Sequence, residues 1–479
     1  MKKSSLYLLP LSAAAIMSAV SCASGSSSYM GGEVTGVGGT VWAEPTPYGM
    51  VLVSRGSMEV GLQKPDSVWN LPESARGISV DAFWMDETEI TNSKYKQFVF
   101  WVRDSIIRER LADPAYGGNE EFKIEEDKEG NPINPYLNWN KPIPWRTASE
   151  DEQRAIESVY RTNPITGKRE LDPEQLNYRY EVYNHTEAAK RKNRLDARRR
   201  IYNTDIPTPT DLPIISKDTA YVDDEGQIVR RTITRGLTGD FDFLNTYIVN
   251  VYPDTTAWIN DFDNAYNEPY VRLYFSHAGY NEYPVVGVSW EQANAFCNWR
   301  TDYLRRSIGR EGVYVEPYRL PTEAEWEFAA RTGVNDNKYP WEGDLPLSED
   351  RGCFYANFKP AEGNYVRDGQ LITARVGTYT PNDFGLFDMA GNVSEWTSTA
   401  YTESVSKLTN DINPEYRYDA AIEDPYKMKR KIVRGGSWKD VAHNIRSDIR
   451  MWEYQNEQRS YIGFRCVRTQ IGFAKGNKQ

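Results

Sequence analysis

Apolar positions along the chain follow two spacings, and each spacing predicts a different element. Over its first part, the segment 78–85 alternates apolar and polar residues, as a half-buried strand does. A helix is predicted after it, because Thr91 can cap a run whose apolar residues recur three and four positions apart. These residues are Tyr95, Phe98, Val99, Val102 and Ile106. We therefore expect a strand and an amphipathic helix here, preceded by a short hairpin-like opening over 50–61.

Two more helices are predicted by capping boxes, in which Ser or Thr is followed three residues later by Glu or Gln. Ser289 and Gln292 begin the first helix, and Thr322 and Glu325 begin the second. Their expected buried faces are Ala293, Phe296, Cys297, Tyr303 and Leu304 in the first, and Trp326, Ala329 and Ala330 in the second. The rest of the C-terminal half is short apolar pieces broken by Gly, Pro and Asn, which favours a loop-rich α+β fold.

A long stretch, 109–280, separates the first of these helices from the second. Its middle is highly charged, and 181–200 is expected to form an exposed helix with a basic run. Such a run is usually a solvated face, but it can also dock to an acidic partner or to anionic lipid headgroups. The later part, 247–253, is typical of a strand.

Composition excludes several classes of function. The 479 residues are 39% apolar and 13% aromatic, which is typical of a globular chain. A net charge of −11 argues against a nucleic-acid partner, which would be gripped through its phosphates. His185, His277 and His443 are scattered without ligand spacing, so a histidine-based metal site is not expected.

The N-terminus has the pattern of a targeting segment. Lys2 and Lys3 precede a largely apolar stretch from Leu6 to Val20, which is short for a membrane span. A small residue then precedes Cys22, as in a bacterial lipobox, so 1–21 is expected to be a lipoprotein signal peptide and Cys22 the acylated residue. The alternative is a plain signal peptide with an incidental cysteine. The Ser- and Gly-rich segment 22–45 is typical of a flexible tether.

Three C-terminal segments carry a family resemblance. They are 385–396 (Gly-Leu-Phe-Asp-Met-Ala-Gly-Asn-Val-Ser-Glu-Trp), 433–438 (Val-Arg-Gly-Gly-Ser-Trp) and 463–466 (Gly-Phe-Arg-Cys). Together they resemble the formylglycine-generating-enzyme (sulfatase-modifying factor) domain. The resemblance covers about 46–108 and 281–470 and implies a loop-rich, C-type-lectin-like α+β fold. On this view 109–280 is a long insertion and a candidate for partner binding, and 471–479 is a tail.

The same resemblance predicts that this chain has lost the chemistry of the family's active members. Active members bind copper through two cysteines five residues apart, and those positions fall on Asp440 and Ile445 in this chain. A carboxylate and an alkyl side chain cannot replace two thiolates as ligands of Cu(I), so no copper and no enzymatic activity are expected. Ser437, Asp440 and His443 could suggest a hydrolase, but no Gly-x-Ser-x-Gly elbow accompanies them.

The resemblance also implies a disulfide and two structural calcium sites. It pairs Cys297 with Cys466, which leaves Cys353 either as a buried small apolar residue or as an intermolecular contact. The first calcium site would use Asn357, Phe358, Asp368 and Gln370. The second would use Ala390, Gly391, Val393 and Glu395. The alternative for each set is that these residues only cap turns.

Two further runs of sequence resemble one particular group of proteins. Trp101–Arg108, together with Tyr274–Tyr280 leading into 284–290, is similar to the GldK/PorK-type lipoproteins of gliding motility and type IX secretion. This similarity implies an outer-membrane lipoprotein on the periplasmic face that forms a ring with copies of itself and a PorN/GldN-type partner. The expected function is therefore a non-enzymatic scaffold. A ligand-binding module that uses the old cleft and an oxygen-dependent enzyme are the alternatives.

Overall fold

The computed structural model describes most of the chain between residues 43 and 474. Within that span, 61–75, 127–128, 165–166, 194–212, 224, 309–313, 334–337, 344–345, 347–352, 361–362, 365, 404–407 and 422 are outside the description. The signal peptide, Cys22 and nearly all of the tether also lie outside the described residues. Among the described helices, none has the length and apolar character needed to cross a membrane.

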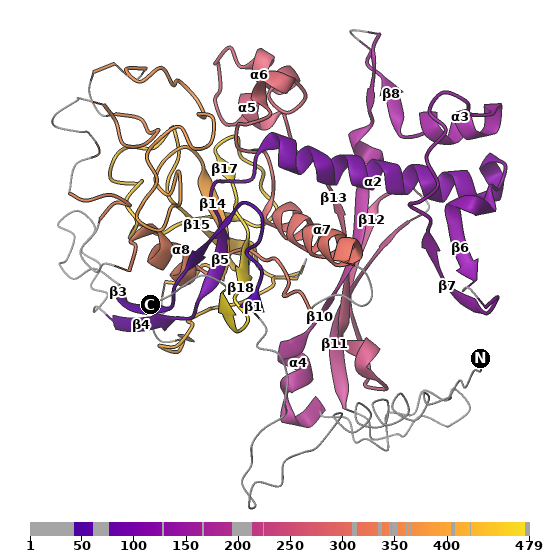
Figure 1. Cartoon of the computed structure of the whole chain (residues 1–479), viewed down its shortest axis with the longest axis horizontal. Coiled ribbons are helices and arrows are strands. Elements are labelled where there is room, and N and C mark those ends of the chain that lie inside the picture. The colour runs from indigo at the N-terminus through magenta and orange to yellow at the C-terminus, as the bar shows by residue number, and fades with distance from the viewer. Residues whose placement is uncertain are drawn as a thin grey trace, which may run out of the picture.

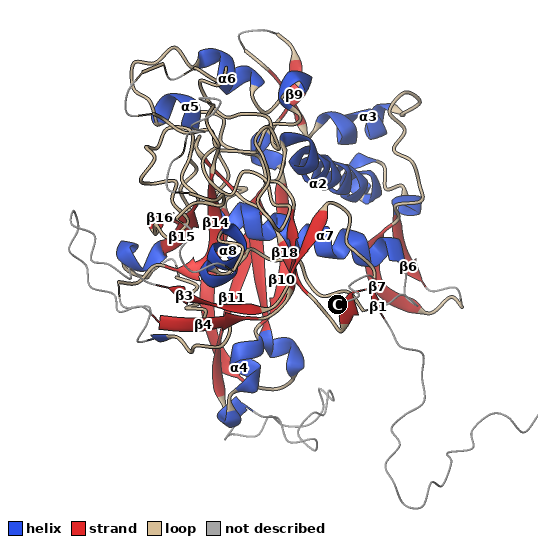
Figure 2. Cartoon of the chain, turned by 60° about the vertical axis from the view of Figure 1, so that its left-hand side comes forward, coloured by secondary structure: helices blue, strands red, loops and turns tan. Residues whose placement is uncertain are grey.

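The body is built on small sheets whose strands come from both ends of the chain. A three-stranded sheet has the order β18 (Val467–Thr469), β5 (Phe83–Asp86) and β2 (Met50–Val53). A four-stranded sheet has the order β16 (Met451–Tyr454), β15 (Arg430–Arg434), β14 (Ser394–Ala400) and β17 (Ile462–Gly463). The two ends of the described part of the chain meet where β1 (Ala43–Glu44) pairs with β19 (Phe473–Ala474). Long loops surround the four-stranded sheet (Figure 2).

The N-terminal predictions are confirmed in part. The segment 78–85 forms parts of two strands, because β4 (Arg76–Val80) ends before β5 begins. The hairpin-like opening is wrong: β2 pairs with β5, and β3 (Gly56–Val60) pairs with β4 instead of with β2. The predicted helix is α2 (Asn92–Ala112), and the Thr91 side chain accepts a hydrogen bond from the Lys94 amide, as a cap should.

Both capping boxes are present. Ser289 and Gln292 exchange hydrogen bonds at the start of α7 (Trp290–Ile308), and Thr322 and Glu325 do so at α8 (Glu323–Ala330). On α7 three residues of the expected apolar face, Ala293, Phe296 and Cys297, are buried, and Leu304 is half-buried. Tyr303 is exposed and stacks on Trp299. α8 is buried on nearly every side, so its apolar stripe was too narrow a prediction.

The stretch 109–280 contains many short elements. These are η1 (Pro114–Tyr116), η2 (Glu120–Phe122), β6 (Lys123–Glu126), β7 (Pro132–Leu137), α3 (Glu150–Glu157), β8 (Tyr160–Thr162), β9 (Arg169–Leu171), η3 (Pro173–Gln175), β10 (Asn177–Tyr183), α4 (His185–Ala189), η4 (Arg191–Asn193), β11 (Ile214–Val222), β12 (Ile228–Gly236), η5 (Asp240–Phe243), β13 (Leu244–Asn250), α5 (Ala257–Asn260), α6 (Glu268–Leu273) and η6 (Ala278–Tyr280). The strand predicted over 247–253 is largely β13. The helix predicted over 181–200 is wrong for 181–193, which contain the end of β10, the short α4 and η4. The rest of that prediction, 194–200, lies outside the described residues.

This stretch packs into the main core. Leu176, Tyr178 and Val251 share a buried cluster with the aromatic residues of α2 and α7. The Tyr95 hydroxyl of α2 donates to the Val251 carbonyl at 2.9 Å. In Figure 1, α7 lies beside the strands β10 and β13, and α2 runs from the C-terminal body to α3 and the β6–β7 hairpin. The insertion is therefore joined to the body through a shared core.

Candidate functional site

The positions that the resemblance assigns to the copper cysteines lie in a tight loop after β15. Gly436 in this loop has φ +66°, and a Cβ there would lie 2.8 Å from both the Asn444 carbonyl oxygen and the Ile445 side chain. Asp440 is buried, and its carboxylate accepts from the Ser437 amide at 3.0 Å and from the Ser437 hydroxyl at 2.6 Å. Ile445 is fully buried in an apolar cluster with Tyr339 and Phe358. These two residues do not fit a copper ion.

A shallow pocket of about 350 Å³ lies beside Asp440. Its wall includes Tyr401, Trp452 and Tyr461. The Lys439 ammonium lies 3.1 Å from the Asp440 carboxylate and 4.0 Å from the centroid of the Tyr461 ring. The pocket therefore has aromatic sides and a cation already matched by a carboxylate, which suits a small polar ligand.

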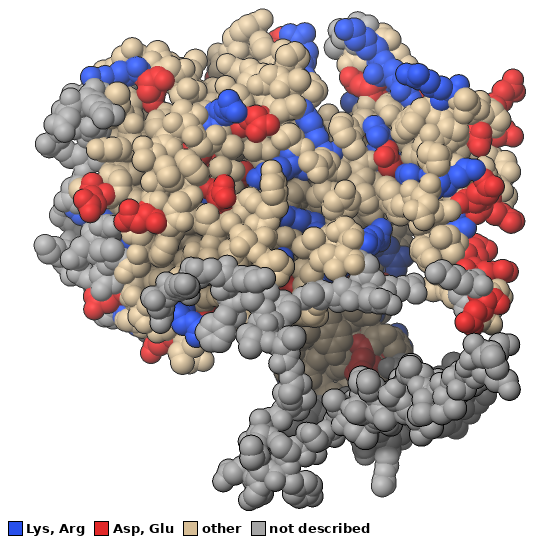
Figure 3. All heavy atoms as spheres, viewed as in Figure 1, with Lys and Arg blue, Asp and Glu red and all other residues tan. Residues whose placement is uncertain are grey.

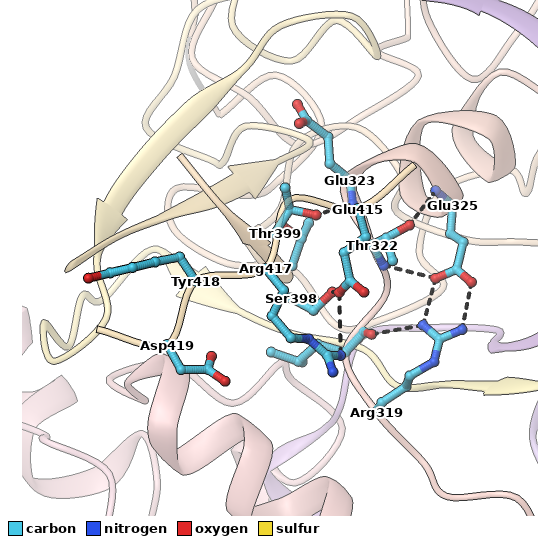
Figure 4. Close-up of polar contacts among 12 residues, drawn as sticks. Arg319, Thr322, Glu323, Glu325, Ser398, Thr399, Glu415, Arg417, Tyr418 and Asp419 are labelled. Atoms are coloured by element: carbon cyan, nitrogen blue, oxygen red, sulfur yellow. Dashed lines mark hydrogen bonds and ion pairs between the residues drawn. The ribbon is translucent and has the colours of Figure 1, made fainter. Parts of the chain in front are cut away.

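Polar contacts fix the start of α8 and hold the loop 415–419 to strand β14 of the four-stranded sheet. Figure 4 shows Arg319 bound to both carboxylate oxygens of Glu325, at 2.6 and 2.7 Å. Glu415 accepts from the Ser398 hydroxyl of β14 at 2.7 Å. Next to this cluster, the Lys431 ammonium is buried, and it donates to the Tyr418 carbonyl at 2.7 Å. Burial lowers the pKa of Lys431, and the hydrogen bond compensates part of the cost of burying its charge.

The first predicted calcium set is held by contacts within the protein. The Asn357 side chain donates to the Ile372 carbonyl at 2.8 Å, and the Asn357 backbone carbonyl accepts from the Asn392 backbone amide at 2.7 Å. The Tyr379 hydroxyl donates to Asp368, and the Gln370 amide lies 3.5 Å from the same carboxylate. Phe358 is buried in the cluster that also contains Ile445. These contacts fix the loop, and calcium binding to it stays a prediction.

The second predicted set contacts the first. Gly391 has φ +73°, and a Cβ there would lie 2.2 Å from the Asn357 carbonyl oxygen, so only glycine fits at this crossing. Ala390 and Val393 are buried on either side of it. Glu395 is bound by Arg465, at 2.6 to 2.9 Å, and by the Trp326 indole at 2.8 Å. To bind a metal ion, the Glu395 carboxylate would have to give up these hydrogen bonds. Within the described residues, no group of three or more His, Cys, Asp or Glu side chains could hold a metal ion.

The two cysteines of the predicted disulfide lie together. The sulfur atoms of Cys297 and Cys466 are 3.4 Å apart, both residues are buried, and both are free thiols in this structure. Burial raises the pKa of the Cys297 thiol well above its ordinary value. The bond itself stays a prediction. Cys353 is exposed, so its interpretation as a buried apolar residue is wrong.

Sequence reasoning missed a buried pair of carboxyl groups behind these loops. Glu89 is fully buried and accepts from the Asn392 side-chain amide at 3.0 Å, and Asp388 accepts from the Gly377 amide at 2.7 Å. Burial raises the pKa of Glu89 well above its ordinary value, and the Asp388 carboxylate raises it further. Burial also raises the pKa of Asp388. The only sequence signal was that Asp388 lies within the conspicuous run 385–396.

Comparison with known proteins places these features in a family context. A family model described as "Sulfatase-modifying factor enzyme 1-like domain" matches residues 40–167 and 236–470. The match covers well over half of the chain. It enters both ends of the expected insertion and leaves 168–235 unmatched.

Three relatives illustrate the range of proteins that contain this domain. The inactive C-alpha-formylglycine-generating enzyme 2 of Bos taurus is 34% identical over 192 residues, which are 39% of this chain and 50% of the relative. The formylglycine-generating enzyme of Mus musculus is 33% identical over 193 residues, which are 39% of this chain and 44% of the relative. The serine/threonine-protein kinase pkn1 of Chlamydia pneumoniae is 30% identical over 244 residues, which are 47% of this chain and 33% of the relative. The chain therefore spans half or less of the length of these relatives.

Proposed function

Because this chain belongs to the sulfatase-modifying factor enzyme 1-like domain family, whose α+β fold it shares, we propose that it is a non-enzymatic member that acts as an assembly scaffold. The observation that carries the proposal is the pair Asp440 and Ile445. A buried carboxylate bound to Ser437 and a buried alkyl side chain occupy the positions that the family resemblance assigns to the two copper cysteines. Without thiolates there is no soft ligand for Cu(I), so the body would serve a structural role.

The scaffold is proposed to be an outer-membrane lipoprotein of a type IX secretion or gliding-motility machine. The lipobox at Cys22 supports a lipid anchor, and the runs at 101–108 and 274–280 support the GldK/PorK-type assignment. The partners would be a PorN/GldN-type protein and further copies of the chain, arranged as a ring at the periplasmic face. Structural calcium would stiffen the loop around Asn357 and Asp368.

The surface of the stretch 109–280 favours this role. Figure 3 shows acidic side chains gathered along the edge of the molecule where Figure 1 places α3 and the β6–β7 hairpin. The exposed acids there are Glu120, Glu121, Glu125, Glu126 and Glu150. Lys123 pairs with Glu125 and Lys141 pairs with Glu121, so the edge carries both charge signs with the acids in excess. A charged surface of this kind suits a polar interface that selects its partner by charge.

The proposal is tested by the native particle, extracted in mild detergent and measured by mass photometry and negative-stain microscopy. A large closed assembly that contains a second protein is the expected result. A lone particle of about the chain's own mass, 55.0 kDa, would contradict the scaffold. As a control, oxygen consumption with a cysteine-containing peptide should stay at the buffer rate, and turnover would contradict the loss of enzymatic chemistry.

The pocket beside Asp440 favours ligand binding as a second candidate function. Its aromatic wall and its Lys439–Asp440 pair could hold a peptide or a sugar without turnover. A single-particle result together with a ligand that co-purifies, and is lost in a Trp452→Ala variant, would favour this candidate over the scaffold.

A further inference from the structure

Strand β12 is the outer strand of a sheet-like layer in the stretch 109–280. β10 pairs with β13, and β11 pairs with β12 along nine residues of each strand. β11 lies against β13, and the Asp218 amide donates to the Asn245 side chain at 3.2 Å, which joins the two pairs. In Figure 1 the four strands run together beside α7. Among the described strands, β12 therefore pairs only with β11, and its other edge is free of strand pairing.

The free edge is open along the middle of the strand. The residues Arg231 to Arg235 are all exposed, in sequence Arg-Thr-Ile-Thr-Arg. Within the described residues, their backbone groups make no hydrogen bond outside the pairing with β11. An edge of this kind presents a row of unpaired N–H and C=O groups that can pair with another extended chain.

The side chains of one face specify a charge pattern. Arg231, Ile233 and Arg235 alternate with the two threonines and so lie on the same face of β12. The Arg231 guanidinium lies over the Tyr221 ring, 5.6 Å from its centroid. Arg235 lies 3.0 Å from the buried Asp242 carboxylate and remains 42% exposed. The edge thus carries two oriented cations four residues apart, with an apolar side chain between them.

This pattern disfavours a second copy of β12 as the added strand. The sequence from 231 to 235 reads the same in both directions, so an antiparallel copy centred on Ile233 would place Arg231 opposite Arg235 twice. A parallel copy in register would also place arginine opposite arginine. Like charges that face each other across a strand pair destabilise it. A strand with carboxylates four residues apart would instead place opposite charges together on the same face.

We propose that β12 binds an extended acidic segment of a partner protein as an added strand, with two carboxylates four residues apart facing Arg231 and Arg235. The inference rests on the proposed scaffold function and names the element that would make its contact. The location supports it, because β11 and nearly all of β12 fall within 168–235, the part that the family model leaves unmatched. Backbone pairing would supply the affinity, and the two arginines would select the partner.

The test uses the full chain and synthetic nine-residue peptides followed by fluorescence anisotropy. The probe alternates Thr and Val and has Glu at two positions four apart. A charge-reversed peptide has Lys at those positions, and a third peptide keeps both Glu residues but is N-methylated at alternate amides. We expect the Glu peptide to bind and the other two to lose most of their affinity. Arg231→Glu should weaken the Glu peptide by about tenfold, as expected for the loss of one charge pair at an edge, and should improve binding of the Lys peptide.

Several outcomes would overturn the inference. Equal binding of the N-methylated peptide would mean simple ion pairing without an added strand. If the Glu peptide does not bind, the arginines would instead serve to protect the strand edge against aggregation. Arg154→Glu, a swap of an exposed arginine on α3, is the matched control and should leave peptide binding unchanged.

The native particle separates this inference from the scaffold itself. If the particle forms with the unaltered chain and Arg231→Glu reduces its yield, both proposals hold. A particle that Arg231→Glu leaves intact would contradict the role of β12 and retain the scaffold. Peptide binding without any particle would retain β12 as a docking strand and contradict the scaffold.

Discussion

The guanidinium of Arg465 binds the carboxylate of Glu395 at 2.6 to 2.9 Å, and both side chains are withdrawn from solvent. Arg465 also donates to the Phe387 carbonyl at 2.9 Å, and Glu395 also accepts from the Trp326 indole. The pair therefore joins the terminal Gly-Phe-Arg-Cys segment to β14 and α8. Each charge is solvated by the other instead of by water.

Replacing Arg465 by Met should destabilise the protein strongly. The substitution would leave Glu395 as a buried charge without a counterion, which typically costs about 3–5 kcal/mol. The measurement is the urea midpoint followed by tryptophan fluorescence. Arg154→Met is the matched control, because Arg154 pairs with Asp151 in solvent and such a pair contributes about 0–1 kcal/mol. Similar midpoints for the two variants would contradict the role assigned to the Arg465–Glu395 pair.

The proximity of Cys297 and Cys466 predicts a disulfide under oxidising conditions. Their sulfur atoms are 3.4 Å apart, and the bond would close a long loop, which stabilises by roughly 4–5 kcal/mol in the loop-entropy model. We expect a cross-linked peptide by mass spectrometry without reductant, and a lower melting temperature for Cys297→Ser. Cys353→Ser, at an exposed cysteine, should melt as the unaltered protein does. Alkylation of both thiols in the unfolded, unreduced chain would rule out the bond.

Local signals predicted α2, α7 and α8 well, and the pairing of the first strands was harder to foresee. Thr91, Ser289 and Thr322 cap helices as expected, because a helix cap is decided by residues within three positions of one another. The strand partners of β2 and β3 depend on contacts between distant segments, which no local pattern encodes.

The candidate site was only partly predictable for the same reason. The substitutions at Asp440 and Ile445 are visible in the sequence, and so is the Cys297–Cys466 pairing once the family resemblance is stated. The burial of Glu89 was not visible, because it depends on Asn392 and Asp388 arriving from some three hundred residues away. A carboxyl group in a run of polar residues is normally exposed, and only the assembled fold reverses that expectation.

The buried carboxyl pair predicts a specific dependence of stability on pH. Glu89 Oε2 and Asp388 Oδ1 are both buried, and within the described residues neither oxygen has a hydrogen-bond donor. One retained proton between the two groups would supply the missing donor, in agreement with their raised pKa values. The folded state therefore holds a proton that the unfolded chain releases above its ordinary carboxyl pKa. Stability should fall as the pH rises from that value towards the raised folded pKa.

Glu89→Gln should flatten this dependence. The amide is neutral at every pH, its oxygen can still accept from Asn392, and its N–H can donate to Asp388. The melting temperature of the variant and of the unaltered protein should be compared between about pH 5 and pH 8. Glu120→Gln, at an exposed carboxylate, should retain the original slope. An equal slope for Glu89→Gln and the unaltered protein would show that the buried pair does not hold the proton.

Calcium binding at the loop of Asn357 and Asp368 predicts a ligand-dependent gain in stability. A single site that binds only the folded state stabilises it by about 2.7 kcal/mol at a hundredfold excess over Kd. The melting temperature should therefore rise with added calcium and fall after chelation with EGTA. Asp368→Asn should abolish the response, because an amide lacks the charge that a hard cation prefers. Asp383→Asn, at an exposed aspartate on a neighbouring turn, is the control and should respond as the unaltered protein does.

Glu395 is already bound by Arg465, so we expect one calcium equivalent rather than two by titration calorimetry. No change in melting with calcium or EGTA would mean that Asn357 and Asp368 only cap their turns.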